Sequence, residues 1–125
     1  MNLQPRPLLY LSFCLLAGGC GTPLPPAADP AQAQSALKTA LDAWQKGETA
    51  ESLQSRSPAI NVNDAGWSSG DRLVKYEIQS EQASGQSWKA RVLLTVQNGS
   101  SSPTQQQATY TVDTTPAVVV VRDFE

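Results

Sequence analysis

The chain has 125 residues, of which 9 are basic and 11 acidic, and it contains no histidine. This length suits one domain of ordinary size and is too short for two. Without histidine, and with only two cysteines, the usual zinc, copper and haem sites and a histidine-based triad are excluded, so we expect neither metal nor cofactor. The net charge of −2 includes no basic stripe, which argues against nucleic acid as a partner.

An apolar run lies near the start of the chain, from Leu8 to Ala17. It is only about half as long as the roughly 20 residues that a membrane-spanning helix needs. It does fit the apolar region of a secretory signal, with Arg6 as the positive flank and small residues before Cys20. We therefore predict a signal peptide over residues 1–19, whose removal leaves 106 residues.

Leu16-Ala17-Gly18-Gly19-Cys20 resembles the lipobox of bacterial lipoproteins, with alanine at position 17 where leucine is commoner. The resemblance implies that the Cys20 thiol receives a diacylglycerol group, that cleavage precedes Cys20, and that the new amine is acylated, with palmitate as the expected chain. Such lipid chains would anchor the protein to a membrane of the cell envelope. Gly21, in place of an aspartate, favours the outer membrane. The alternatives are an ordinary signal cut near Gly19 or Gly21, and lipidation at Cys14.

Residues 20–29 are predicted to form a tether, because three of the residues from 21 to 29 are proline. A helix follows, with Asp29 as N-cap, Pro30 at the first position, Gln32 placed to close a capping box, and Gly47 at the end. Its apolar residues recur at helical spacing and predict one buried stripe. The stripe consists of Ala33, Leu37, Ala40, Leu41 and Trp44.

The next segment is less regular. Thr49 and Leu53 suggest a short second helix that ends before Pro58. Alternation predicts a short strand over residues 60–63, and residues 63–71 read as turns.

From Arg72 onward the chain alternates between apolar and polar residues, which predicts an antiparallel meander. Val74, Tyr76 and Ile78 are predicted on one face of its first strand, and Leu73 and Leu93 on the opposite face of their strands. The strands are expected around residues 72–79, 88–96, 107–112 and 118–121. The fold class is thus α+β over residues 30–125, with an N-terminal helix, and the short second helix, on a curved antiparallel sheet of four to five strands.

This order of elements resembles the cystatin-like and nuclear-transport-factor-2-like folds, in which a bent sheet cradles a helix. The chain is also similar to a set of small bacterial lipoproteins that combine a lipobox with an "ALxxALxxWxxG" helix and a "GxRLVxYEI" strand. The matching residues are Ala36-Leu37, Ala40-Leu41, Trp44 and Gly47, then Gly70, Arg72-Leu73-Val74 and Tyr76-Glu77-Ile78. The resemblance implies a fold and an envelope location, and no activity.

Aromatic residues supply the candidates for a pocket or an interface, although their alternation is also typical of a core. They are Trp44, Trp67, Tyr76, Trp88 and Tyr110. Carboxylates are the only acid–base groups, and we expect those at Asp42, Asp64, Asp71, Glu77 and Asp113 to be solvated charges or turn residues. Residues 64–71 lack the ligand spacing of a calcium loop.

We therefore predict a non-catalytic interaction or structural module at the cell envelope. The alternatives are a small-ligand binder with a cavity between helix and sheet, and a proton-transfer enzyme of the cone-shaped class. The valine run at 118–121, with Leu73 and Leu93, predicts an apolar patch on the outer face of the sheet. That patch would contact a second copy of the chain or another envelope protein.

Overall fold

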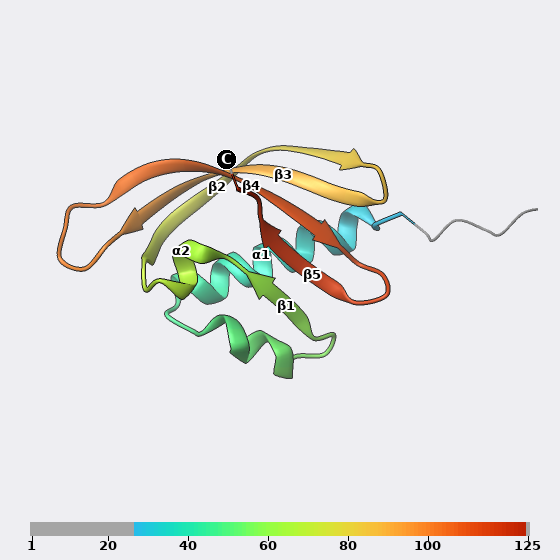
Figure 1. The fold of residues 1–125 in the computed structure, drawn as a ribbon, viewed down its shortest axis with the longest axis horizontal. Helices are drawn as coiled ribbons and strands as arrows, with labels where there is room; N and C mark the ends of the chain where they lie inside the picture. Colours follow the sequence, from blue (N-terminus) through green and yellow to red (C-terminus); the bar gives the residue numbers. More distant parts are fainter. Residues whose placement is uncertain (1–26, 125) are drawn as a thin grey trace, which may run out of the picture.

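The computed structural model describes residues 27–124, in which one long helix lies across a curved five-stranded sheet (Figure 1). The predicted signal peptide, Cys20 and most of the predicted tether lie outside the described residues. In chain order the elements are α1 (Pro30–Gln45), η1 (Ala50–Ser55), β1 (Ile60–Asn63), α2 (Ala65–Ser68), β2 (Arg72–Ser84), β3 (Ser87–Gln97), β4 (Thr104–Asp113) and β5 (Val118–Arg122). The α+β class, with an N-terminal helix packed on a sheet, is confirmed.

Helix α1 begins where the sequence predicts. The Asp29 carboxylate accepts a hydrogen bond from the N–H of Ala31 at 3.1 Å, and Pro30 takes the first helical position. The predicted capping box is wrong, because the N–H of Asp29 donates to Oγ1 of Thr114 at 3.2 Å instead of to Gln32. At the other end Gly47 has a φ of 87°, in the left-handed region that favours glycine.

The buried stripe of α1 is confirmed and is wider than predicted. Leu37 and Leu41 are almost completely buried, and burial of such a side chain contributes about 1.5–3 kcal/mol. The buried residues of the helix are Ala33, Ala36, Leu37, Ala40, Leu41, Ala43 and Trp44. They pack in one core with the inner face of the sheet.

The short second helix is also confirmed, as the 3₁₀ helix η1. The Thr49 side chain accepts a hydrogen bond from the N–H of Ser52, and Leu53 is completely buried. The predicted turn region after β1 contains one further helical turn, α2, which Asp64 caps.

The sheet has the strand order β1-β5-β4-β3-β2, so the first and last strands of the chain are neighbours. Strands β2 to β5 form antiparallel pairs, as predicted, whereas β1 runs parallel to β5 with Ile60 opposite Val118. The expectation of a wholly antiparallel sheet is therefore wrong. The pairing of β1 with β5, in either direction, places the apolar β5 inside the sheet, where a run of valines is buried better than at an edge.

A β-bulge near the start of β2 reverses two predicted orientations. Leu73 lies opposite Val96 and Lys75 opposite Thr95, so Val74 is the extra residue. Because one extra residue exchanges the two faces of a strand, Leu73 points inward with 1% of its surface exposed, and Val74 points outward with 37% exposed. Beyond the bulge, Tyr76 and Ile78 return to the inner face and pack against the core, as predicted.

Candidate functional site

The five aromatic candidates do not gather around one cavity. Trp44 and Trp67 stack on each other, with ring centroids 5.6 Å apart and planes 10° from parallel. Trp88 and Tyr110 are buried on the inner face of β3 and β4. Tyr76 is half-buried on β2, where its hydroxyl donates to Oδ1 of Asp42 at 2.8 Å. The structure therefore assigns these residues mainly to the core.

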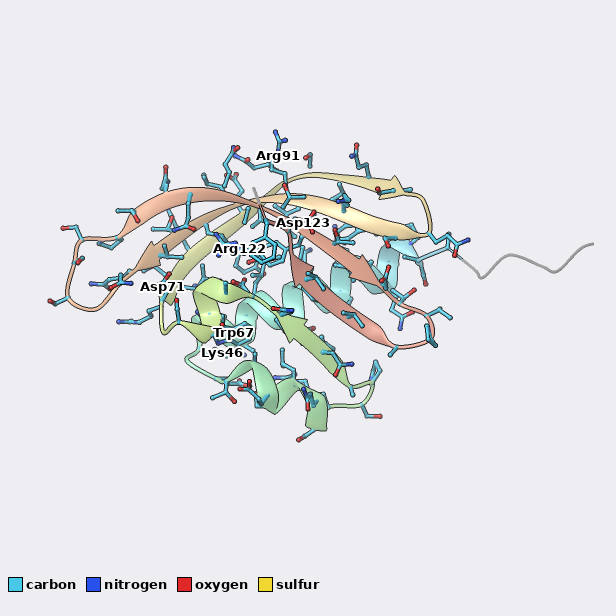
Figure 2. The ribbon with its side chains drawn as sticks, in the orientation of Figure 1. Lys46, Trp67, Asp71, Arg91, Arg122 and Asp123 are labelled. Carbon is cyan, nitrogen blue, oxygen red and sulfur yellow. The ribbon has the colours of Figure 1, made fainter. Side chains whose placement is uncertain are left out.

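The stacked tryptophans use both of their indole N–H groups for structure. Nε1 of Trp44 donates to the carbonyl of Asp71 at 2.7 Å, and Nε1 of Trp67 donates to the carbonyl of Glu48 at 3.0 Å. These bonds join the end of α1, the loop before η1, α2 and the start of β2. Asp71 is labelled on the left of the domain in Figure 2, whereas α1 begins on the right in the same view (Figure 1). The pair is thus a structural clamp at this far end.

The most unusual polar residue of the described chain is Asp64, which is buried with 4% of its surface exposed. Its Oδ1 accepts hydrogen bonds from the N–H groups of Gly66 and Trp67 and from the guanidinium of Arg122. Its Oδ2 accepts the hydroxyl of Tyr110. Of the two expected roles, solvated charge or turn residue, the first is wrong: Asp64 caps the helical turn α2, is buried, and accepts hydrogen bonds from four donors.

The partly buried Arg122, at the end of β5, contacts Asp64 as well (labelled in Figure 2). Its Nη1 lies 3.3 Å from Oδ1 of Asp64, and its Nη2 donates to Oε1 of Gln106 on β4. Sequence reasoning missed the cluster because its members are far apart in the chain. The sequence does carry one signal for Asp64: an aspartate directly before a helical turn is a typical N-cap.

The environment of Tyr110 keeps its hydroxyl protonated. Burial raises the pKa of Tyr110 far above its usual range, and the Asp64 carboxylate raises it further, while Arg122 lowers it. For Tyr76, partial burial is the largest cause and the bond to Asp42 the next, and together they raise its pKa to about 12. Both hydroxyls therefore act as hydrogen-bond donors at neutral pH.

Two surface grooves border the helices. The α1-flank groove, of about 350 Å³, lies between one side of α1 and residues 56–58, with Ile60 and Val118 in its floor. The far-end groove, of about 450 Å³, is bordered by the tryptophan pair and by the carboxylates of Glu48, Glu51 and Asp71. Both grooves are open to solvent, whereas the space between α1 and the sheet is filled by the buried side chains of one core cluster.

The outer face of the sheet is mostly polar. Leu93 is flanked there by Glu77 and Gln107, and Val121 by Asn63 and Thr111. The predicted apolar patch is therefore broken up: polar neighbours separate Leu93 from Val121, and the bulge in β2 turns Leu73 into the core. Among the described residues, the large apolar side chains that are well exposed are Val74 and Phe124.

The described residues show neither a metal site nor a membrane-spanning helix. Within residues 27–124, no three histidine, cysteine, aspartate or glutamate side chains lie close enough together to hold a metal ion. In the same part of the chain, no helix has the length and apolar character needed to cross a membrane. Comparisons of the chain with family models, with curated proteins and with solved structures find no match.

Proposed function

We propose that the chain is a lipid-anchored, non-catalytic module of the cell envelope. In this proposal Cys20 carries the lipid, and the helix-and-sheet domain is presented to a partner. The main support for a non-catalytic role comes from the interior of the domain. Side chains fill the space between α1 and the sheet, and the carboxylate of Asp64 already accepts hydrogen bonds from four donors.

A proton-transfer enzyme of the cone-shaped class needs a carboxylate that faces substrate in a cavity. Asp64 and Tyr110 are the chemically suitable pair in the described chain, yet each satisfies the other under the cover of α2. Exposing either group to a substrate would break a buried charge-assisted hydrogen bond, which costs more than breaking a neutral one. This cost favours the interaction module over the enzyme.

The start of the domain supports a defined orientation at the membrane. The N–H of Ala28 donates to the carbonyl of Gln86 at 2.8 Å, and the N–H of Asp29 donates to Thr114. The chain therefore enters the domain beside the β2–β3 and β4–β5 turns (Figure 1). The eight residues between Cys20 and Asp29 span at most about 29 Å. In the proposal these two turns lie near the bilayer, and the far end with Asp71 points away from it.

The proposed partner is a second copy of the chain or another envelope protein. Because the outer face of the sheet is polar, a contact on that face would depend on hydrogen bonds and charges more than on buried apolar area. For the fold we propose the cystatin-like or nuclear-transport-factor-2-like class. The support is a single long helix lying across a curved sheet, while the parallel β1–β5 pair adds an element that the resemblance alone did not imply.

The test combines lipid analysis with site-specific cross-linking in the native envelope. Mass spectrometry should find acyl and diacylglyceryl groups on Cys20, and Cys20→Ser should release the protein from the membrane fraction. A photo-cross-linking residue at Gln107, exposed on the outer face of the sheet beside Leu93, should capture a protein partner. The same residue at Gln86, beside the chain entry, is the matched control and should capture lipid or nothing. An unmodified Cys20 in a membrane-free protein would overturn the proposal.

A further inference from the structure

The side of α1 that faces the α1-flank groove differs from the rest of its surface. It presents Gln32, Ser35, Ala36 and Thr39, which are spaced so that they form one line along the helix. None of these side chains is charged and none is bulky. The exposed side of the helix outside the groove carries Lys38 and Asp42 instead. The side of α1 that borders the groove is therefore an uncharged strip on an otherwise ordinary surface helix.

The floor of the groove is aliphatic. Ala36, Ile60 and Val118 are exposed by 6%, 5% and 5%, so a small part of each reaches the groove, whereas neighbouring Leu37 is completely covered. A volume of about 350 Å³ lies within the range in which proteins hold small molecules. An aliphatic group placed on this floor would remove apolar surface from water.

The rim of the groove supplies hydrogen bonds and one positive charge. Ser35, Thr39 and Ser57 offer hydroxyl groups, and Arg56 is the charged residue of the lining. Arg56 also contacts Glu48 at 3.4 Å, but both side chains are well exposed, and such a surface pair contributes little. The guanidinium can therefore turn toward a bound anion at small cost, and its planar donors suit a carboxylate.

The far-end groove provides the contrast within the same chain. Three carboxylates, those of Glu48, Glu51 and Asp71, border it against a single cation, Arg72, so its net negative charge opposes an anionic ligand; no carboxylate lines the α1-flank groove. From the aliphatic floor, the hydroxyl rim and the single guanidinium, we propose that the α1-flank groove binds an aliphatic group next to a carboxylate. An N-acylated aliphatic amino acid has these two groups side by side, and it can be either a free molecule or the carboxyl end of a peptide. This inference does not depend on lipidation of Cys20.

The experiment is an NMR titration of the full chain in detergent micelles. The probe is N-acetylleucine, and N-acetylleucinamide is the matched ligand that lacks the charge. We expect the acid to shift the amide signals of Ser35, Thr39 and Ile60, with a dissociation constant of about a millimolar, and the amide to bind about tenfold more weakly. A short peptide that ends in leucine distinguishes the sources: tighter binding than N-acetylleucine indicates a chain end, and equal binding indicates a free acid.

Three variants locate the site. Arg56→Gln should weaken binding of the acid about tenfold and leave binding of the amide unchanged, since only the acid uses the charge. Ser35→Leu, an exposed position at the rim, should block both ligands, while Lys38→Leu on the same helix but outside the groove should block neither. Urea unfolding checks that each variant is folded. Equal shifts by acid and amide, no shift with ligand at about ten times the expected constant, or unchanged binding by Ser35→Leu would each overturn the proposal.

Discussion

Two regions of the domain contain the same chemical pair, a tyrosine hydroxyl that donates to an aspartate, in opposite surroundings. In the first region, Tyr76 on β2 donates to Asp42 on α1, and Asp42 is open to solvent. Under α2, Tyr110 donates to Asp64; both residues are buried, and the partly buried Arg122 lies beside them. Water can replace either partner in the first pair but not in the second. The difference shows that burial, more than the identity of the bond, decides what such a pair contributes.

The largest effect is expected for Asp64→Ala. The substitution removes the cap of α2, the acceptor of the Tyr110 hydroxyl and the charge that faces Arg122. Breaking a buried pair by removing one partner typically costs about 3–5 kcal/mol. Urea unfolding followed by tryptophan fluorescence measures this change. Asp42→Ala is the matched control and should cost less than about 1 kcal/mol; equal losses would refute the comparison.

A smaller loss is expected for Tyr110→Phe. The ring stays and fills the same volume, so the change isolates the hydroxyl. Oδ2 of Asp64 would lose its donor in a buried site, which we expect to lower the free energy of unfolding by about 2 kcal/mol. A thermal melt and a urea titration give the value. If the variant is as stable as the native chain, water reaches Asp64 and the pair is not effectively buried.

High pH provides a third test of the buried pair. The unfolded chain ionises its tyrosines near pH 10, whereas the pKa of Tyr110 in the folded protein lies far above that value, so the folded state retains a proton that the unfolded state loses. This stabilisation is complete below pH 10 and declines as the pH rises above it. Between pH 9 and pH 11 we expect Tyr110 to account for a loss of about 1.4 kcal/mol. Tyr110→Phe should show a correspondingly flatter alkaline decline in urea unfolding, and an identical decline would contradict this account.

The smallest effect is expected for Tyr76→Phe. The pKa of Tyr76 is raised to about 12, but its partner Asp42 is exposed and solvent screens the interaction. We expect the free energy of unfolding to change by less than about 0.5 kcal/mol. The same urea measurement applies, and a loss as large as that of Tyr110→Phe would show that exposure does not separate the two regions.

Local patterns predicted most of the fold. The Asp29-Pro30 start, the stripe on α1 and the turn at Gly47 depend on neighbouring residues, and all three are present. The failures involve residues that meet only in the folded chain. The N–H of Asp29 found Thr114 in place of Gln32, and the bulge at Val74 moved Leu73 inward. A bulge adds one residue to one strand, and the alternation within that strand does not reveal it.

The candidate sites were less predictable than the fold. The sequence offers five aromatic candidates, whereas in the structure Trp44 and Trp67 stack as a clamp and Trp88 and Tyr110 belong to the core. The α1-flank groove lies outside that set, because its lining contains no aromatic residue and comes from α1, residues 56–60 and β5. Nothing in the spacing of Ser35, Arg56 and Val118 along the chain indicates that they border one cavity.

The sequence by itself determined the helix with its buried stripe and the approximate positions of the strands, and it predicts an envelope address through Cys20. These features follow from residue periodicity and from motifs of a few adjacent residues. Only the tertiary structure decided that β1 runs parallel to β5 and that Asp64 is buried and saturated. It also decided that a groove without a carboxylate runs along α1. Each of these depends on which distant segments come into contact, and that choice reflects the packing of the whole core.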